Sequence, residues 1–134
     1  MTFRPDVLRG ASVGASVGTV DFRLARAAVV KEFRRGRLSR LDVCDAHPEL
    51  LRAATHHGRP APEPCPICED VPVLVTYVFG RRLPPGGRCL TSLKELATLD
   101  RQRRELAAYE VEVCPACRWN HLRRTFPVGR GQGG

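Results

Sequence analysis

Two pairs of cysteines, each with two residues between them, are the clearest chemical feature of this 134-residue chain. The first pair is Cys65 and Cys68, in "CPIC", and the second is Cys114 and Cys117, in "CPAC". This spacing lets both thiolates of a pair reach one ion at about 2.3 Å, and two such turns complete the tetrahedron that zinc prefers. The proline after each first cysteine fixes the backbone of the turn. The pattern therefore predicts one structural zinc ion held by four cysteines.

Other uses of a CxxC pair fit the sequence less well. A redox pair of the thioredoxin type stands alone at the start of a helix, whereas both pairs here adjoin predicted strands. A catalytic zinc keeps one coordination position open, whereas four thiolates close the shell. No Ser/His/Asp ordering, phosphate-binding loop or carboxylate pair stands out, so we expect no enzymatic activity and no small-molecule substrate. A thiol redox sensor that releases zinc under peroxide remains a further alternative.

A second metal site is the weaker interpretation of the remaining cysteines and histidines. Cys44 and His47 have a ligand-like spacing, and the residues that could complete such a site are Cys89, His56 and His57. Cysteine is among the most frequently buried residues, so a core role is the simpler interpretation of Cys44 and Cys89.

Short helices are predicted in the first part of the chain. One begins near Val20, because apolar residues recur there at three- and four-residue spacing on one face: Phe22, Ala25, Val29 and Phe33. Gly36 is placed to end this helix. Ser39 then caps a short helix, and Pro48 suits the first turn of a third one that Gly58 ends.

Alternating residues predict strands at 73–79, 109–113 and 122–128, the second with a wet face that carries Glu110 and Glu112. The first cysteine pair precedes the first strand, and the second pair lies at the tip of the hairpin between the other two. That arrangement resembles a zinc ribbon. The 45 residues between the pairs exceed the usual spacing, and an inserted loop and helix over 81–104 explain the excess.

The predicted fold is therefore α+β, with N-terminal short helices packed on a three-stranded antiparallel zinc ribbon that carries a helical insertion. We expect a flexible N-terminal tail at 1–18 and a helical segment at 19–60. The zinc-ribbon-like domain would occupy 61–128, followed by a disordered tail at 129–134.

The chain is basic, with 22 Lys and Arg against 14 Asp and Glu and a formal charge of +8. This balance favours an anionic partner such as DNA, RNA or a ribonucleoprotein. All but two of the cations are arginines, which is also the residue usage of a high-GC coding sequence. Four thiolates around a divalent ion carry a net charge of −2, so the metal-loaded protein would stand near +6.

Trp119, the only tryptophan, follows the second cysteine pair and lies among arginines. An exposed tryptophan there could stack on a base while guanidinium groups hold phosphate, or it could instead pack over the metal site. Arg81 and Arg82 come just after the predicted strand 73–79, and Arg123 and Arg124 lie in the predicted strand 122–128. If those two strands pair, the four arginines would form a basic rim. The residues that could contact nucleic acid or a partner are then Arg81, Arg82, Arg118, Trp119, Arg123 and Arg124.

Nothing in the sequence predicts a membrane protein. No stretch approaches the roughly 20 apolar residues of a membrane span, and the small, polar "ASVGASVG" at 11–18 is unlike the core of a signal peptide. We therefore expect a cytoplasmic protein, in a compartment where thiols stay reduced.

The chain resembles a small, uncharacterised actinobacterial family, a domain of unknown function. The resemblance covers about residues 20–129, and its most specific segments are "VCDAHPELLRAA" and "VCPACRWNHL". It implies helices docked on a zinc ribbon and a high-GC, cytoplasmic setting, and it supplies no established activity. The function that we expect is an accessory protein that binds nucleic acid or a nucleoprotein machine in transcription or translation. The alternative is a protein–protein adaptor that uses the helical segment and the ribbon.

Overall fold

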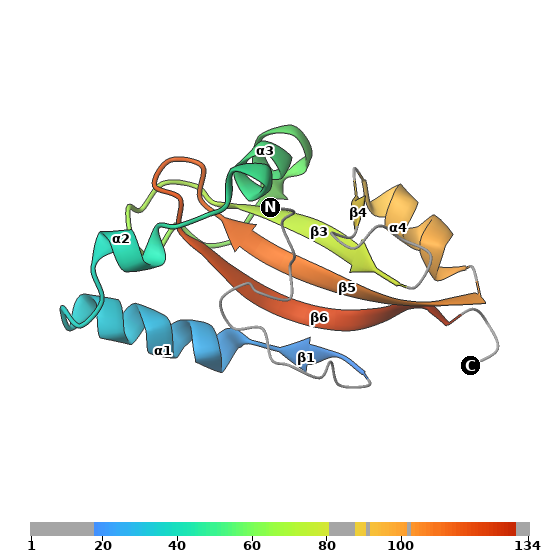
Figure 1. The fold of residues 1–134 in the computed structure, drawn as a ribbon, viewed down its shortest axis with the longest axis horizontal. Coiled ribbons are helices and arrows are strands. Elements are labelled where there is room, and N and C mark those ends of the chain that lie inside the picture. Colours follow the sequence, from blue (N-terminus) through green and yellow to red (C-terminus); the bar gives the residue numbers. More distant parts are fainter. Residues whose placement is uncertain (1–17, 81–87, 91, 102, 131–134) are drawn as a thin grey trace.

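Three long antiparallel strands form the centre of the protein (Figure 1). The computed structural model describes residues 18–80, 88–90, 92–101 and 103–130. Strand β5 (Arg103–Val113) lies between β3 (Val73–Phe79) and β6 (Asn120–Arg130) and pairs with both. Three strands of two residues extend this sheet: β1 (Val20–Asp21) on β6, and β2 (Arg59–Pro60) and β4 (Arg88–Cys89) on β3. A mixed fold of helices and antiparallel strands is thus confirmed.

The strands β5 and β6 are longer than their alternating patterns predicted. The sequence suggested that a helix would continue to about residue 104, but α4 (Leu93–Asp100) ends earlier. Residues beyond it pair with β6 instead, with Leu106 opposite Val128 and Ala108 opposite Phe126. A register shift at Glu110 interrupts this pairing, as expected of a β-bulge.

Several helix ends lie where the sequence predicted them, although the first helix begins at Arg23 rather than near Val20. In α2 (Arg40–Val43), Ser39 Oγ accepts a hydrogen bond from the Asp42 amide at 3.2 Å, and the Asp42 carboxylate accepts one from the Ser39 amide. Helix α3 (Pro48–His57) begins at the predicted proline. Gly36, at a φ of 77°, follows the end of α1 (Arg23–Arg34) in the left-handed conformation that glycine favours.

The face that α1 buries matches the predicted one in part, since Phe22, Val29 and Phe33 are partly buried and pack on core clusters. Ala25 is exposed, whereas Val30 is buried and Phe33 is partly buried. Arg26 also points inward, where it binds the carboxylate of Glu112. The apolar pattern did not include Arg26 in this face, because a count of hydrophobic residues leaves out charged side chains.

The helices pack against different sets of strand residues. Helix α3 packs on a cluster that includes Val75, Tyr77, Val111, Val113 and Leu122. Residues at the end of α4 pack on a second cluster with Val78, Leu106, Ala108 and Val128. Since successive side chains of a strand point to opposite faces, these two helices cover opposite faces of the sheet.

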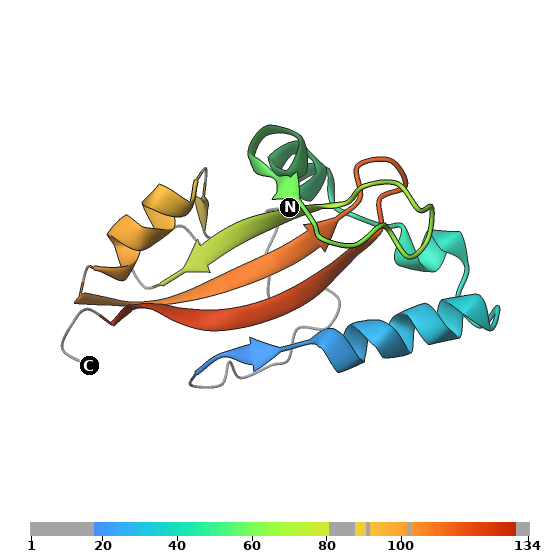
Figure 2. The same cartoon turned by 180° about the vertical axis from the view of Figure 1, so that it is seen from behind.

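Helix α1 runs on the β6 side of the sheet, as both views of the ribbon show (Figures 1 and 2). Its C-terminal half reaches the end of the sheet where the loops at 61–72 and 114–119 lie. The predicted division into a tail at 1–18, two segments and a tail at 129–134 stays a prediction, because residues 1–17 and 131–134 are outside the described part of the chain. None of the described helices has the length and apolar character needed to span a membrane.

Candidate metal centre

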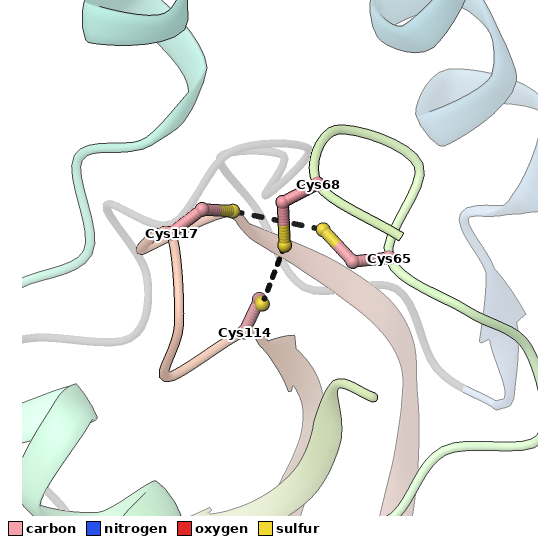
Figure 3. Close-up of side chains that lie close together, drawn as sticks. All are labelled: Cys65, Cys68, Cys114 and Cys117. Carbon is pink, nitrogen blue, oxygen red and sulfur yellow. Dashed lines mark hydrogen bonds between the residues drawn. The ribbon is translucent and has the colours of Figure 1, made fainter. Parts of the chain in front are cut away.

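The two cysteine pairs meet at one end of the sheet, where their four sulfur atoms point toward one another (Figure 3). Cys65 and Cys68 belong to the loop before β3, and Cys114 and Cys117 form the turn between β5 and β6. This is the placement that the sequence predicted. The sheet itself brings the pairs together, because β3 and β5 are neighbours and Val73 stands opposite Val113.

The distances between the sulfur atoms suit one tetrahedral ion. All four lie within 4.8 Å of one another, with 3.6 Å between Cys65 and Cys117 and 3.5 Å between Cys68 and Cys114. Four sulfurs at about 2.3 Å from a central ion would be separated by about 3.8 Å. A disulfide needs about 2.05 Å between sulfurs, and all four cysteines are free. The donor set and its spacing therefore fit a bound metal ion.

The two cysteine turns have nearly the same backbone conformation. The residue after each second cysteine is left-handed, with a φ of 69° at Glu69 and 75° at Arg118. Each donates its amide to the carbonyl of the first cysteine of its pair, at 3.0 Å in the first turn and 2.8 Å in the second. Because a left-handed conformation is costly for residues other than glycine, its occurrence at both equivalent positions indicates that the turns are shaped for a ligand.

Backbone amides are directed at the sulfur atoms. The Ile67 amide lies 3.4 Å from Sγ of Cys65, and the Trp119 amide lies 3.4 Å from Sγ of Cys117. Burial favours the neutral thiol, but hydrogen bonds from the backbone of Asp70 and from neighbouring thiols hold the pKa of Cys68 below its ordinary value. Amides in this position stabilise the negative charge of metal-bound thiolates.

In the second cysteine pair, burial outweighs the hydrogen bonds, and the pKa of both thiols is raised. Burial raises the pKa of the Cys114 thiol to about 11. It also raises the pKa of Cys117, with further contributions from neighbouring thiols. A divalent cation reverses this preference, since coordinated thiols are deprotonated.

The centre is embedded in an apolar cluster of its own. Val30 and Phe33 of α1, Val43 of α2 and the fully buried Trp119 all belong to the cluster that contains the four cysteines. The metal centre thus lies between the N-terminal helices and the sheet. A metal ion held by these cysteines would therefore stabilise the packing of α1 and α2 as well as the cysteine loops.

A buried carboxylate links this cluster to α1. The side chain of Glu112 is 1% exposed, and its Oε1 and Oε2 accept hydrogen bonds from Arg26 at 2.7 and 3.0 Å. Trp119 Nε1 donates to it at 3.0 Å, and Arg123 donates at 3.1 Å. Burial would raise the pKa of Glu112, but the hydrogen bonds and charge of Arg26, aided by the other two donors, hold it below the usual range.

Glu110 has a similar environment two residues earlier. It is 8% exposed and binds Arg59 at 2.9 Å and Arg124 at 3.2 Å. The prediction that Glu110 and Glu112 would form a wet face was therefore wrong. Arginines from other elements cover both carboxylates, and alternation along a single strand cannot reveal such partners.

The predicted contact residues have different surroundings. Trp119 is completely buried, so it does not stack on a base; it packs on His121 with ring centroids 6.0 Å apart. Arg123 and Arg124 are held by the carboxylates just described, and Arg124 also lies over the ring of Phe126 at 4.6 Å. Arg118 is exposed.

The strands on which the predicted basic rim depended, β3 and β6, do not pair with each other, so the rim stays a prediction. Arg81 and Arg82 lie outside the described residues. They follow β3, which pairs with β5, and β5 separates β3 from the β6 strand that carries Arg123 and Arg124.

The structure gives the other cysteines and histidines separate places. Cys44 packs on the metal-centre cluster, and it contributes to the raised pKa of Cys117. Cys89 packs against the α3 cluster, and His47 Nδ1 accepts the Glu49 amide at the start of α3. Among the residues that the structure describes, the four-cysteine group is the one set of clustered ligands.

Arg26 and Glu112 are the important residues that sequence reasoning missed. They are 86 positions apart, so no local pattern connects them. The one available signal was that Arg26 interrupts the apolar face of a predicted helix, at the position where an inward side chain is expected.

Comparison with known proteins supplies the family. A family model described as "Family of unknown function (DUF5318)" matches residues 14–133. Similar proteins are the uncharacterized protein Rv0049 of Mycobacterium tuberculosis and the uncharacterized protein Mb0050 of Mycobacterium bovis. Each is 39% identical over 124 residues, which cover 86% of this chain and 90% of theirs. No solved structure matches the chain significantly. The resemblance to an uncharacterised actinobacterial family is confirmed, and the chain belongs to the family of unknown function DUF5318.

Proposed function

We propose that this protein is a non-enzymatic, zinc-binding accessory protein that binds nucleic acid or a nucleoprotein machine in transcription or translation. The observation that carries the proposal is the set of four cysteine sulfurs within 4.8 Å of one another. Thiolate ligands select soft ions, and a tetrahedral set of four is typical of structural zinc.

The role assigned to the zinc is structural. Four thiolates fill the tetrahedral shell and leave no position for a substrate or a reactive water. One knuckle before a strand and one at a hairpin tip support a zinc-ribbon-like description of the centre. The apolar cluster around the cysteines supports a role in holding α1 and α2 to the sheet.

The nature of the partner rests on charge. The chain has a formal charge of +8, and a zinc tetrathiolate would leave it near +6. A net charge of this size in a small protein favours association with polyanions. The reduced thiols that the centre needs suit the cytoplasm, where we place the protein.

The test is nucleic-acid binding by the purified, nuclease-treated, zinc-loaded protein. Fluorescence anisotropy with a labelled 20-mer, as duplex DNA and as single-stranded RNA, would be measured from 50 to 300 mM salt. We expect the logarithm of the binding constant to fall linearly with the logarithm of salt concentration. Absence of binding to both probes at 50 mM salt would remove nucleic acid from the proposal.

A protein–protein adaptor is the second candidate, and two exposed leucines favour it. Leu24 on α1 is 82% exposed and Leu41 on α2 is 87% exposed. Apolar side chains of this kind can form the core of an interface. An adaptor would keep a purified protein partner at 0.5 M salt and would lose it when Leu24 and Leu41 become serine. Nucleic-acid binding, by contrast, would weaken as the salt concentration rises.

A further inference from the structure

The positive charge of the chain is concentrated in one short segment. Residues 23–40 contain seven arginines and lysines and a single carboxylate, Glu32. This segment therefore contributes +6 of the formal +8. The remaining residues contribute +2, and a zinc tetrathiolate would contribute −2. The molecule outside residues 23–40 would therefore be close to neutral. The partner-binding charge belongs to α1 and the turn after it.

Four of these cations lie on one side of α1. At about 100° per residue, Arg23, Arg34, Lys31 and Arg35 fall within an arc of about 120°. Between them the helix carries alanine and leucine, and no acidic residue. The inward side of the helix carries Arg26, Val29 and Phe33, which are all partly buried, and the buried Val30 lies at the edge of that side next to Arg23. The cations thus form an outward face about 18 Å long, from the 1.5 Å rise per residue.

These four side chains are not neutralised within the described part of the protein. Arg23, Lys31, Arg34 and Arg35 are all exposed. The ion pairs of this segment involve other residues: Arg26 binds Glu112, and Arg37 binds Glu32 at 3.3 Å. Of the described carboxylates, none lies within ion-pair distance of the four.

A groove of about 730 Å³ separates α1 from the loop of the first cysteine pair. Lys31, Arg34 and Arg35 line one wall, whereas Glu63 and Glu69 line the other. The two carboxylates, and the thiolate charge behind them, would repel a polyanion from the depth of the groove. An anionic chain is therefore expected to contact Lys31, Arg34 and Arg35 from their solvent-exposed side rather than from within the groove.

We infer that the outward face of α1, formed by Arg23, Lys31, Arg34 and Arg35, is the surface that holds the sugar–phosphate backbone of nucleic acid. The inference rests on the proposed function and names its contact surface. It replaces the region of Arg123 and Arg124, whose guanidinium groups already bind buried carboxylates. A row of cations without bidentate partners suits phosphates and carries no code for base sequence.

The test is a triple variant, Lys31→Gln, Arg34→Gln and Arg35→Gln, in the zinc-loaded full chain. Four phosphate contacts predict a salt slope of about −3.6 on duplex DNA and about −2.8 on single-stranded RNA. With one contact left, these slopes should fall to about −0.9 and −0.7. Affinity at 0.1 M salt should drop on the order of 100-fold. Zinc content and thermal melting would establish that the variant is folded.

The matched control is a second triple variant with the same loss of charge elsewhere. It changes three exposed cations, one on α3, one on α4 and one directly after α4: Arg52→Gln, Lys94→Gln and Arg101→Gln. We expect this control to keep the wild-type slope. A charge-retaining variant, Lys31→Arg with Arg34→Lys and Arg35→Lys, should also keep it, because a phosphate contact requires charge rather than one side-chain shape.

The outcomes separate the inference from the function on which it rests. If the wild type binds nucleic acid and the α1 variant keeps its slope, or loses no more than the control, the inference is overturned and the proposed function stands. If polyglutamate displaces nucleic acid at equal charge concentration, the face serves an acidic protein and the inference is again overturned. If the wild type binds neither probe at 50 mM salt, the proposed function itself fails.

Discussion

Replacement of Glu112 by glutamine tests the link between α1 and the metal centre. The substitution keeps the size of the side chain but removes the charge that Arg26 and Arg123 share. Arg26 is 15% exposed, so its guanidinium would be left largely buried without a counterion. Removal of one partner from a buried ion pair costs about 3–5 kcal/mol. Because glutamine still accepts one hydrogen bond, we expect a loss of about 3 kcal/mol in the free energy of unfolding at pH 7.

The assay is urea unfolding of the zinc-loaded protein, followed by the fluorescence of the single buried tryptophan. The matched control is Glu32→Gln, which breaks the exposed pair with Arg37 on the same helix. That change should cost less than about 0.5 kcal/mol. In a double-mutant cycle, the variant that combines Glu112→Gln with Arg26→Met should be more stable than Glu112→Gln alone. The reason is that it leaves one buried cation fewer without a partner.

The effect of Glu112 must also depend on pH. The folded protein holds the pKa of Glu112 below its usual value, so its contribution is fully present above the unfolded pKa of about 4.3 and is lost as pH falls through the folded pKa. The stability difference between wild type and Glu112→Gln should therefore shrink below about pH 4. Zinc release at low pH affects both proteins and also the Glu32→Gln control. A difference below about 0.5 kcal/mol at pH 7, or one that stays constant down to pH 3, would refute the reasoning.

Three further results follow from the backbone and the remaining thiols. Arg118→Gly should raise stability by about 0.5–1 kcal/mol in urea unfolding, because glycine relieves the left-handed strain at a φ of 75°; Arg118→Ala should give no such gain. Gly58→Ala should lower the free energy of unfolding by about 1–3 kcal/mol, since the new Cβ would lie 2.5 Å from the Ala54 carbonyl oxygen and 2.6 Å from a Val73 methyl group. Thermal melting of the zinc-loaded variant would measure this loss, and an unchanged melting midpoint would contradict the packing. Burial, with the nearby charge of Glu95, raises the pKa of Cys89 to about 11. The rate at which iodoacetamide alkylates Cys89, measured by mass spectrometry, should therefore still increase with pH at pH 10. A rate that reaches a plateau by pH 9 would contradict this.

The cysteine site could be predicted from the sequence because its signals are local. Two residues between cysteines fix the turn, and the flanking strands place one turn at a hairpin tip. Helix ends were predictable for the same reason, as Ser39, Pro48 and Gly36 act on the residues beside them. These features depend on a few neighbouring dihedral angles and need no knowledge of the tertiary structure.

The polar interior could not be predicted, because its partners are distant in sequence. Glu112 looked solvent-exposed, since alternation along one strand assigns charged residues to a wet face. It is buried because Arg26 and Arg123 reach it from α1 and β6. The early start of β5 was missed for a related reason: pairing with β6 overrides the helical tendency of residues after 100.

The location of the positive charge was available in the sequence but was hidden by the whole-chain total. A count over the entire chain treats Arg123 and Lys31 alike. Only the structure separates them, because the first binds Glu112 and the second is exposed on α1. A count over short windows would have indicated residues 23–40 as the basic segment.

The zinc content of the purified protein tests the central claim most directly. Metal analysis of the protein, expressed without added metal and freed of loosely bound ions, should give about one zinc per chain. Alanine in place of Cys65, Cys68, Cys114 or Cys117 should abolish that stoichiometry, whereas Cys44→Ala and Cys89→Ala should retain it. Protein that contains no metal and has four reactive or disulfide-bonded thiols at these positions would contradict the account.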